Sequence, residues 1–150
     1  MKLVLQRVAE ASVSVDSKVI SSIGKGMVVF LCIEKGDTSA LVDRYSSKIS
    51  QLRIFEDSEG KMNLSISDVK GQVLLISQFT LAADAEKGRR PSFDRAAPPD
   101  VALPLYQEFA RKLSEAGVEV MEGVFQAMMK VSLVNDGPVT LILGKRMEEL

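Results

Sequence analysis

The chain has 150 residues, of which 46% are hydrophobic and 26% charged, and its formal net charge is −1. This composition and length predict one globular domain over residues 1–150, and no apolar run approaches the roughly 18 residues needed to span a bilayer. The absence of histidine and the presence of one cysteine exclude an internal disulfide, an imidazole acid–base catalyst and an ordinary zinc site. The charged start of the chain does not fit a secretory signal, so we expect a cytoplasmic protein without a membrane partner.

The first third of the chain is rich in predicted strands. Apolar runs and alternations predict strands over Leu3–Val8, Ala11–Val15, Val19–Ile23 and Met27–Ile33. The last run predicts a strand buried on both faces, in which Cys32 is expected as a small buried hydrophobe. Asp37 or Thr38 is predicted to cap a helix that ends near Leu52. Two short strands are then predicted, over Arg53–Phe55 and Lys61–Ile66.

The second half alternates strands, one long loop and one helix. A strand is predicted over Gln72–Phe79 and a helix over Asp100–Ala116, with Pro104 fitting only near its first turn. The loop between them, Leu81–Pro99, carries the basic cluster Lys87-Gly88-Arg89-Arg90. Judged by charge alone, this cluster fits a solvated loop at least as well as a binding site for nucleic acid. Three further strands are predicted over Val118–Met121, Met128–Val134 and Val139–Leu143. This order predicts an α+β fold: a strongly twisted, partly closed, barrel-like sheet with two packed helices.

Two polar segments stand where predicted strands end. They are Ser77-Gln78-Phe79-Thr80-Leu81 and Asn135-Asp136-Gly137-Pro138-Val139-Thr140. Gly tolerates almost any φ, and the following Pro removes a donor and can accept a cis bond, so this pair can turn main-chain carbonyls in directions that a strand does not offer. Asn135 and Asp136 are interpreted as turn formers.

These two segments resemble the signature segments of the D-aminoacyl-tRNA deacylase family. The segments Gln6-Arg7-Val8, Gly60-Lys61-Met62-Asn63-Leu64 and Arg90-Pro91-Ser92-Phe93 also resemble that family, in the same order, so the resemblance covers nearly the whole chain. It implies a homodimeric enzyme, without metal or cofactor, that hydrolyses the ester joining a D-amino acid to the acceptor end of tRNA.

The resemblance also implies roles for particular residues. The ester pocket is assigned to Ser77, Gln78, Phe79 and Thr80. Chiral selection is assigned to Gly137 and Pro138, which are expected to enter the active site of the other subunit. Arg7 is expected to help hold this Gly-Pro element. Packing around the terminal adenosine is assigned to Phe125 and Met129.

Physical chemistry favours the same division of labour. An editing enzyme that accepts many side chains but one handedness must recognise the α-carbon substituents, and rigid carbonyls can accept the α-ammonium group while leaving no room for an L side chain. Glycine has no handedness, so glycyl-tRNA is an expected further substrate. The ester is already activated and its ribose 2′-hydroxyl can assist, so main-chain donors such as the N–H groups of Phe79 and Thr80 suffice. Thr80 is not expected as the nucleophile because no histidine can activate it.

Other interpretations stay open at this point. From the residues alone, Ser77 and Gln78 can be polar groups at the end of a strand, and Arg7 can be a surface charge. The apolar candidates Phe79, Phe125 and Met129 can be ordinary core residues. One rival function is a related deacylase of relaxed chirality that removes L-alanine or glycine from tRNA. Another is a non-catalytic tRNA- or peptide-binding module. DNA is not expected as a partner, because the net charge creates no attracting field.

Overall fold

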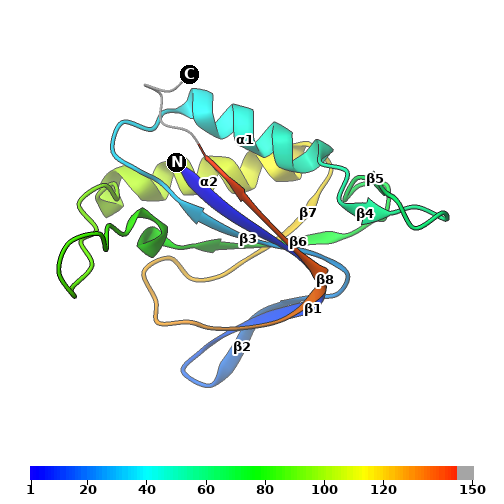
Figure 1. Ribbon diagram of the computed structural model, residues 1–150, viewed down its shortest axis with the longest axis horizontal. Coiled ribbons are helices and arrows are strands. Elements are labelled where there is room, and N and C mark those ends of the chain that lie inside the picture. Colours follow the sequence, from blue (N-terminus) through cyan, green and yellow to red (C-terminus); the bar gives the residue numbers. More distant parts are fainter. Residues whose placement is uncertain (145–150) are drawn as a thin grey trace.

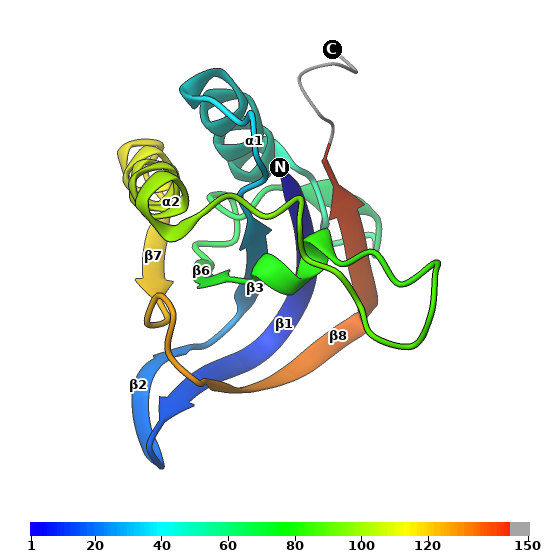
Figure 2. The same ribbon diagram turned by 90° about the vertical axis from the view of Figure 1, so that its left-hand side faces the viewer.

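A computed structural model describes residues 1–144 of the chain. In this part of the chain a mixed six-stranded sheet has the order β2-β1-β3-β6-β7, with β8 pairing on β1. Its strands are β1 (Lys2–Val15), β2 (Lys18–Ile23), β3 (Gly26–Cys32), β6 (Gln72–Ser77), β7 (Glu119–Glu122) and β8 (Lys130–Leu143). The pairs β3–β6 and β6–β7 are parallel and the pairs made by β1 are antiparallel. The sheet curls into a nearly closed barrel (Figure 2).

Two helices, α1 (Ser39–Gln51) and α2 (Pro99–Glu115), lie side by side over one face of the sheet (Figures 1 and 2). Each has an apolar stripe at helical spacing that is buried against the sheet. A 2.9 Å ion pair between Lys112 and Asp43 joins the exposed sides of the two helices. A separate two-stranded hairpin, β4 (Phe55–Glu56) with β5 (Met62–Leu64), projects at one end of the molecule (Figure 1).

The apolar core has two parts. The larger part lies between the sheet and the helices, and the smaller part fills the inside of the curl under the bent halves of β1 and β8. Strands β3 and β6 are buried on almost every residue because the helices cover one face and the curled sheet covers the other. The expectation that Cys32 is buried is confirmed, with 1% of its surface exposed.

Several element boundaries differ from the sequence-based expectation. The sequence predicts four separate strands over residues 3–15 and 128–143, but the structure has two long strands there, β1 and β8. They stay paired with each other along their length because the pairing continues past the irregular points in its register. Strand β6 ends at Ser77, and Phe79–Ala82 form a short 3₁₀ helix, η1, in place of the end of the predicted strand. Pro104 lies inside α2, beyond its first turn.

The α+β class, the barrel-like sheet and the two packed helices are confirmed. Among residues 1–144, no helix combines the length and the apolar character that crossing a membrane requires.

Candidate active site

A cavity of about 580 Å³ opens at the carboxyl end of β6. Three segments contribute its walls: the end of β6 with η1, the stretch that leads into α2, and the loop before β8. The residues that line it are mostly apolar: Ile33, Ile76, Ser77, Gln78, Phe79, Ala96, Ala97, Pro99, Ala102, Phe125, Gln126, Ala127, Met128, Met129 and Val131. The structure therefore brings together five of the residues assigned from the sequence, Ser77, Gln78, Phe79, Phe125 and Met129. Thr80 follows them on η1 without lining the cavity.

The backbone at the end of β6 turns sharply to expose main-chain donors. Gln78 N–H donates to the Leu31 carbonyl at 2.8 Å, and the first helical bond of η1 runs from Leu81 N–H to the Gln78 carbonyl at 3.2 Å. The N–H groups of Phe79 and Thr80 precede that bond, so they have no acceptor within the helix. The Gln78 side-chain amide donates to the Thr80 hydroxyl. This turn can therefore offer two adjacent N–H groups to a developing negative charge.

Side chains support this turn from both sides. The Cys32 thiol lies 3.6 Å from the Phe79 carbonyl oxygen, and burial raises the pKa of the thiol to about 11. It therefore stays protonated at neutral pH and can donate to that carbonyl, but it is a poor nucleophile. Phe79 is 57% exposed, and its ring meets the ring of Phe93 edge-on at 5.3 Å. The alternative that Phe79 is a core residue is therefore wrong.

The opposite wall is set by Phe125 and Met129. The Phe125 ring packs on Tyr106 at 5.8 Å, and the Tyr106 hydroxyl donates to the Leu75 carbonyl at 3.1 Å. Burial raises the pKa of Tyr106 far above its usual range, so this hydroxyl stays neutral and remains a donor. A Cβ atom at Gly123 would lie 2.7 Å from the Met129 sulfur, so this glycine leaves the space that Met129 occupies. The strand β6 and the helix α2 thus position the apolar wall.

The second signature segment lies elsewhere in the same chain. The Gly137-Pro138 peptide bond is cis. Gly137 and Arg7 line a separate cavity of about 210 Å³, together with Lys25, Phe55, Glu56 and Asp136. Within one chain, the structure does not bring Gly137 or Arg7 to the cavity beside Ser77.

Arg7 is buried, with 6% of its surface exposed, so its interpretation as a surface charge is wrong. Its Nη1 donates to the Ile54 carbonyl at 2.8 Å and its Nε donates to the Asp136 carbonyl at 3.1 Å. The carboxylates of Glu56 and Asp136 lie 3.8 Å and 3.7 Å from its guanidinium nitrogens. Arg7 therefore ties the β4–β5 hairpin to the residue that precedes Gly137.

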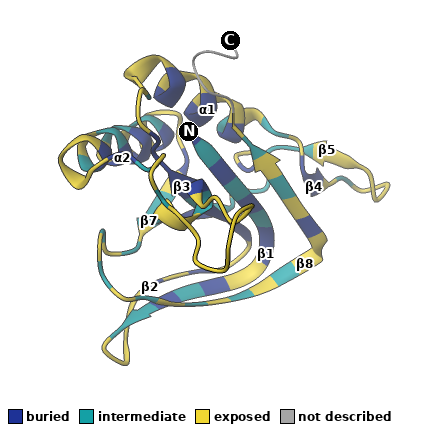
Figure 3. Cartoon of the chain, turned by 60° about the vertical axis from the view of Figure 1, so that its left-hand side comes forward, coloured by how far each residue is buried: buried dark blue, intermediate teal, exposed yellow. Residues whose placement is uncertain are grey.

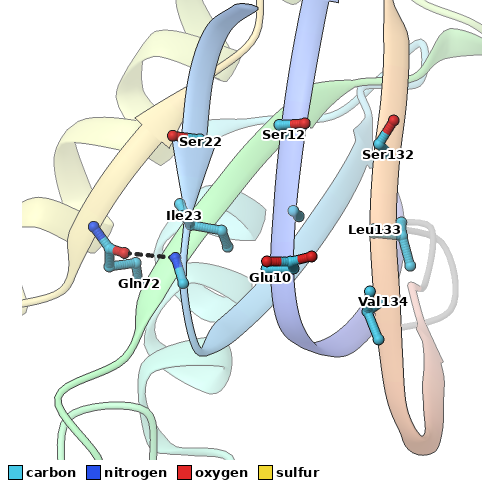
Figure 4. Close-up of a pocket in the computed structure, with 10 residues that line it drawn as sticks. Glu10, Ser12, Ser22, Ile23, Gln72, Ser132, Leu133 and Val134 are labelled. Carbon is cyan, nitrogen blue, oxygen red and sulfur yellow. Dashed lines mark hydrogen bonds between the residues drawn. The ribbon is translucent and has the colours of Figure 1, made fainter.

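A further open hollow of about 630 Å³ lies on the strands β2, β1 and β8 (Figure 4). Ser22, Ser12 and Ser132 face each other in register across these three strands. At its edge the Gln72 side-chain oxygen accepts a hydrogen bond from Gly24 N–H at 3.0 Å. None of its ten lining residues lies in Ser77–Thr80 or Gly137–Pro138, the positions to which roles are assigned.

Sequence reasoning misses the residues that support the cavity from a distance. The apolar patterns indicate Cys32 and Tyr106 as core residues, and they give no individual role to Phe93 or Gly123. The contacts that matter join residues 47 positions apart for Cys32–Phe79 and 31 positions apart for Tyr106–Leu75. No local pattern in the sequence marks such pairs.

The fold and this cavity define a small α+β protein with a barrel-like sheet and an apolar pocket at the carboxyl end of β6. The profile of the family described as D-Tyr-tRNA(Tyr) deacylase matches residues 4–144. The D-aminoacyl-tRNA deacylase of Geotalea daltonii is 59% identical over 143 residues, which are 95% of this chain and 95% of the relative. The chain therefore belongs to the D-aminoacyl-tRNA deacylase family, and it is an ester hydrolase.

Two solved structures are similar to this chain in fold. The structure of a protein named c-Myc DNA Unwinding Element Binding Protein is 40% identical, with a TM-score of 0.90, and the match covers 97% of this chain and 99% of that one. A structure described as a probable eukaryotic D-amino acid tRNA deacylase is 17% identical, with a TM-score of 0.83 over 95% of this chain and 97% of that one. At that identity the second likeness concerns the fold alone.

Proposed function

We propose that this chain hydrolyses the ester bond of D-aminoacyl-tRNA in the cytoplasm and releases the free D-amino acid and tRNA. The observation that carries this proposal is the turn at Ser77–Thr80. The N–H groups of Phe79 and Thr80 precede the first hydrogen bond of η1, and Phe79 lines the apolar cavity. Phe125 and Met129 form the wall on which the terminal adenosine packs, since bases stack well on apolar and aromatic side chains.

Chiral selection is assigned to Gly137 and Pro138 acting in a homodimer, with each dipeptide entering the cavity of the other protomer. Two features support this part. The dipeptide lies apart from the cavity of its own chain. Large apolar side chains are also exposed both at the cavity and on β8, including Phe79 at 57%, Met128 at 91% and Ile142 at 80%. A second copy of the chain would remove such surface from water.

The reaction proceeds without an acid–base dyad. Water attacks the ester carbonyl carbon, the oxygen that becomes negative is held by the N–H groups of Phe79 and Thr80, and the bond to the ribose oxygen breaks as that oxygen takes up a proton. The neighbouring 2′-hydroxyl assists the proton transfer. A Thr80 nucleophile is not required in this scheme, and Cys32 is protonated and buried.

This mechanism predicts that Thr80→Ala retains hydrolysis within about tenfold of the native rate, because the main-chain donor is kept. A substrate ending in 2′-deoxyadenosine, with the D-amino acid on the 3′ oxygen, should be cleaved poorly by both proteins. Trapping an acyl group on Thr80 would overturn the mechanism, although not the deacylase activity.

The acceptor stem is assigned to the exposed basic cluster Lys87, Arg89 and Arg90. Two hydrogen bonds between Asp84 and Ser92, at 2.8 and 2.9 Å, close the base of this loop. Phe93 follows the loop directly and touches Phe79, so the loop emerges beside the cavity; Figure 3 shows that it is largely exposed. Reversing these three charges should weaken tRNA binding and reduce its salt dependence. An unchanged salt dependence would remove the cluster from the interface.

Hydrolysis of D-tyrosyl-, glycyl-, L-alanyl- and L-tyrosyl-tRNA tests the function directly. We expect release from D-tyrosyl- and glycyl-tRNA, and little from the two L substrates. Rapid release of L-alanine would identify the relaxed-chirality rival. Binding of tRNA without any release would identify the non-catalytic one.

One similar structure carries the name of a DNA-binding protein, so duplex DNA belongs in the same assay as a competitor. Because the net charge is −1, we expect duplex DNA to compete weakly.

A further inference from the structure

The Gly137-Pro138 dipeptide stands in a bulge whose base is closed by side chains. Along the β1–β8 ladder, Val8 pairs with Asn135, and pairing resumes two residues earlier on β1 with Gln6 opposite Thr140. Arg7 alone therefore faces the residues 136–139. Such an irregularity leaves the backbone of the bulged strand outside the regular ladder, so its direction must be fixed by other contacts.

Two side chains bind the two ends of this bulge. At its start, Arg7 Nε donates to the Asp136 carbonyl at 3.1 Å. At its end, the Asn135 side-chain Nδ2 donates to the Val139 carbonyl at 3.0 Å and also to the Arg7 main-chain carbonyl at 3.0 Å. Asn135 therefore links the bulge to the strand opposite, and the dipeptide is the middle of the segment held at both ends.

Two neighbours fix the orientation of the Asn135 amide. Its Oδ1 accepts from the Thr140 hydroxyl at 3.3 Å and lies 3.5 Å from Gln6 Nε2, which also donates to the Thr140 hydroxyl at 3.2 Å. With Oδ1 occupied as an acceptor, Nδ2 must point toward the two carbonyls. The three side chains Gln6, Asn135 and Thr140 form one network, which we call the Asn135 clamp.

We propose that Asn135 is a positioning residue for chiral selection. By donating to the carbonyls of Arg7 and Val139, it holds the carbonyls of the dipeptide in the direction that excludes an L side chain. This inference rests on the proposed function, because it assumes that Gly137 and Pro138 meet the substrate. It adds Asn135 to the residues that chiral selection requires, although Asn135 itself touches no substrate. From its type and its place in the sequence, Asn135 is expected only to form a turn.

The clamp is tested by the preference for D- over L-tyrosyl-tRNA, measured as the ratio of the two kcat/KM values. Asn135→Ala should lower this ratio by about tenfold or more, since it removes two hydrogen bonds that orient the bulge. Asn135→Asp should behave in the same way, because a carboxylate keeps the acceptor for Thr140 but loses both donated bonds. Thr140→Val should lower the ratio less, because it removes an orienting bond and leaves both donated bonds possible.

Ser132→Ala is the matched control, since Ser132 lies on the same strand, β8, away from the bulge. The ratio separates positioning from simple loss of folding, because a smaller folded fraction lowers both kcat/KM values equally. If Asn135→Ala does not fold, Gln6→Ala and Thr140→Val still report on the clamp.

The outcomes separate the two proposals. A wild-type chain that cleaves L-tyrosyl-tRNA as fast as D-tyrosyl-tRNA overturns the chiral function itself. A selective wild type together with a folded Asn135→Ala variant of unchanged ratio overturns the clamp and leaves the function standing.

Discussion

The two signature segments are supported in different ways. Ser77–Leu81 starts at the last residue of β6, which pairs with β3 as far as Ser77 and with β7 as far as Leu75, so main-chain hydrogen bonds of the sheet hold its start. Asn135–Thr140 belongs to β8, which pairs with β1 and, among residues 1–144, with no other strand. Its bulge is held instead by side chains of Arg7 and Asn135.

The two kinds of support make the two segments sensitive to different substitutions. The first segment offers main-chain N–H groups, so its chemistry should survive the loss of side chains and fail when a backbone donor is removed. The second segment owes its orientation to side-chain donors, so it should fail when those donors are removed. Each of the following changes tests one side of this contrast.

The largest effect is expected from removing one main-chain donor at the first segment. Phe79→Pro deletes the N–H group at the first position of η1, where proline is well accommodated. Phe79→Ala deletes the same ring and keeps the N–H group. We expect the proline variant to hydrolyse D-tyrosyl-tRNA about 10²- to 10³-fold more slowly than the alanine variant in single-turnover assays. Equal rates would exclude this N–H group as an oxyanion donor.

The next effect concerns the buried arginine of the second segment. Arg7→Leu leaves the carbonyls of Ile54 and Asp136 without their donor, and should lower the free energy of unfolding by about 3 kcal/mol. Arg111→Leu removes an equal charge from an exposed ion pair with Glu115 and should change it by less than about 0.5 kcal/mol. Urea denaturation measures both. If the two variants lost similar free energies of unfolding, Arg7 would stabilise the fold no more than an exposed arginine does.

A smaller effect is expected from Gly137→Ala. Gly137 has a φ of +129°, and a Cβ atom there would lie 2.9 Å from Val139 Cγ2 and 3.1 Å from Arg7 Nη2. Gly36, with a φ of +89° and nothing within 4 Å of an added Cβ, is the control. We expect kcat/KM for D-tyrosyl-tRNA to fall about tenfold in Gly137→Ala and to be unchanged in Gly36→Ala. A fall in both would point to backbone strain in general.

The smallest effect is a pH dependence of stability at Cys32, beneath the first segment. The pKa of the thiol is near 9.0 in the unfolded chain and about 11 in the folded one, so between these values the unfolded chain binds fewer protons and stability falls as pH rises. Between pH 8 and pH 10 this contribution is about 1 kcal/mol. Chemical denaturation should show that Cys32→Ala lacks this part of the decline. The decline that Tyr106 causes is common to both proteins and cancels in the comparison.

Much of the fold could be predicted because local patterns carry it. The unbroken apolar run of β3 and the helical stripes of α1 and α2 report burial directly, and the structure follows them within a few residues. The predictions failed where pairing between distant strands decided the outcome. The residues 135–140 have the composition of a turn, yet they form a bulge inside one strand because β1 pairs with β8 on both sides of them.

The candidate site divides in the same way. The composition alone excludes an imidazole catalyst, since the chain has no histidine. The family could also be inferred from the sequence, because the residue types of two short segments resemble its signature segments. Residue types alone carry that information, because they set which donors, acceptors and backbone angles exist.

The positions of those groups depend on the tertiary structure. It placed Phe125 and Met129 beside Ser77, and the Cys32 thiol under Phe79. It separated Gly137 from that cavity, and it buried Arg7 against the carbonyls of Ile54 and Asp136. These contacts join residues far apart in the chain, and their geometry depends on how the sheet curls and packs, which no local pattern of residues encodes.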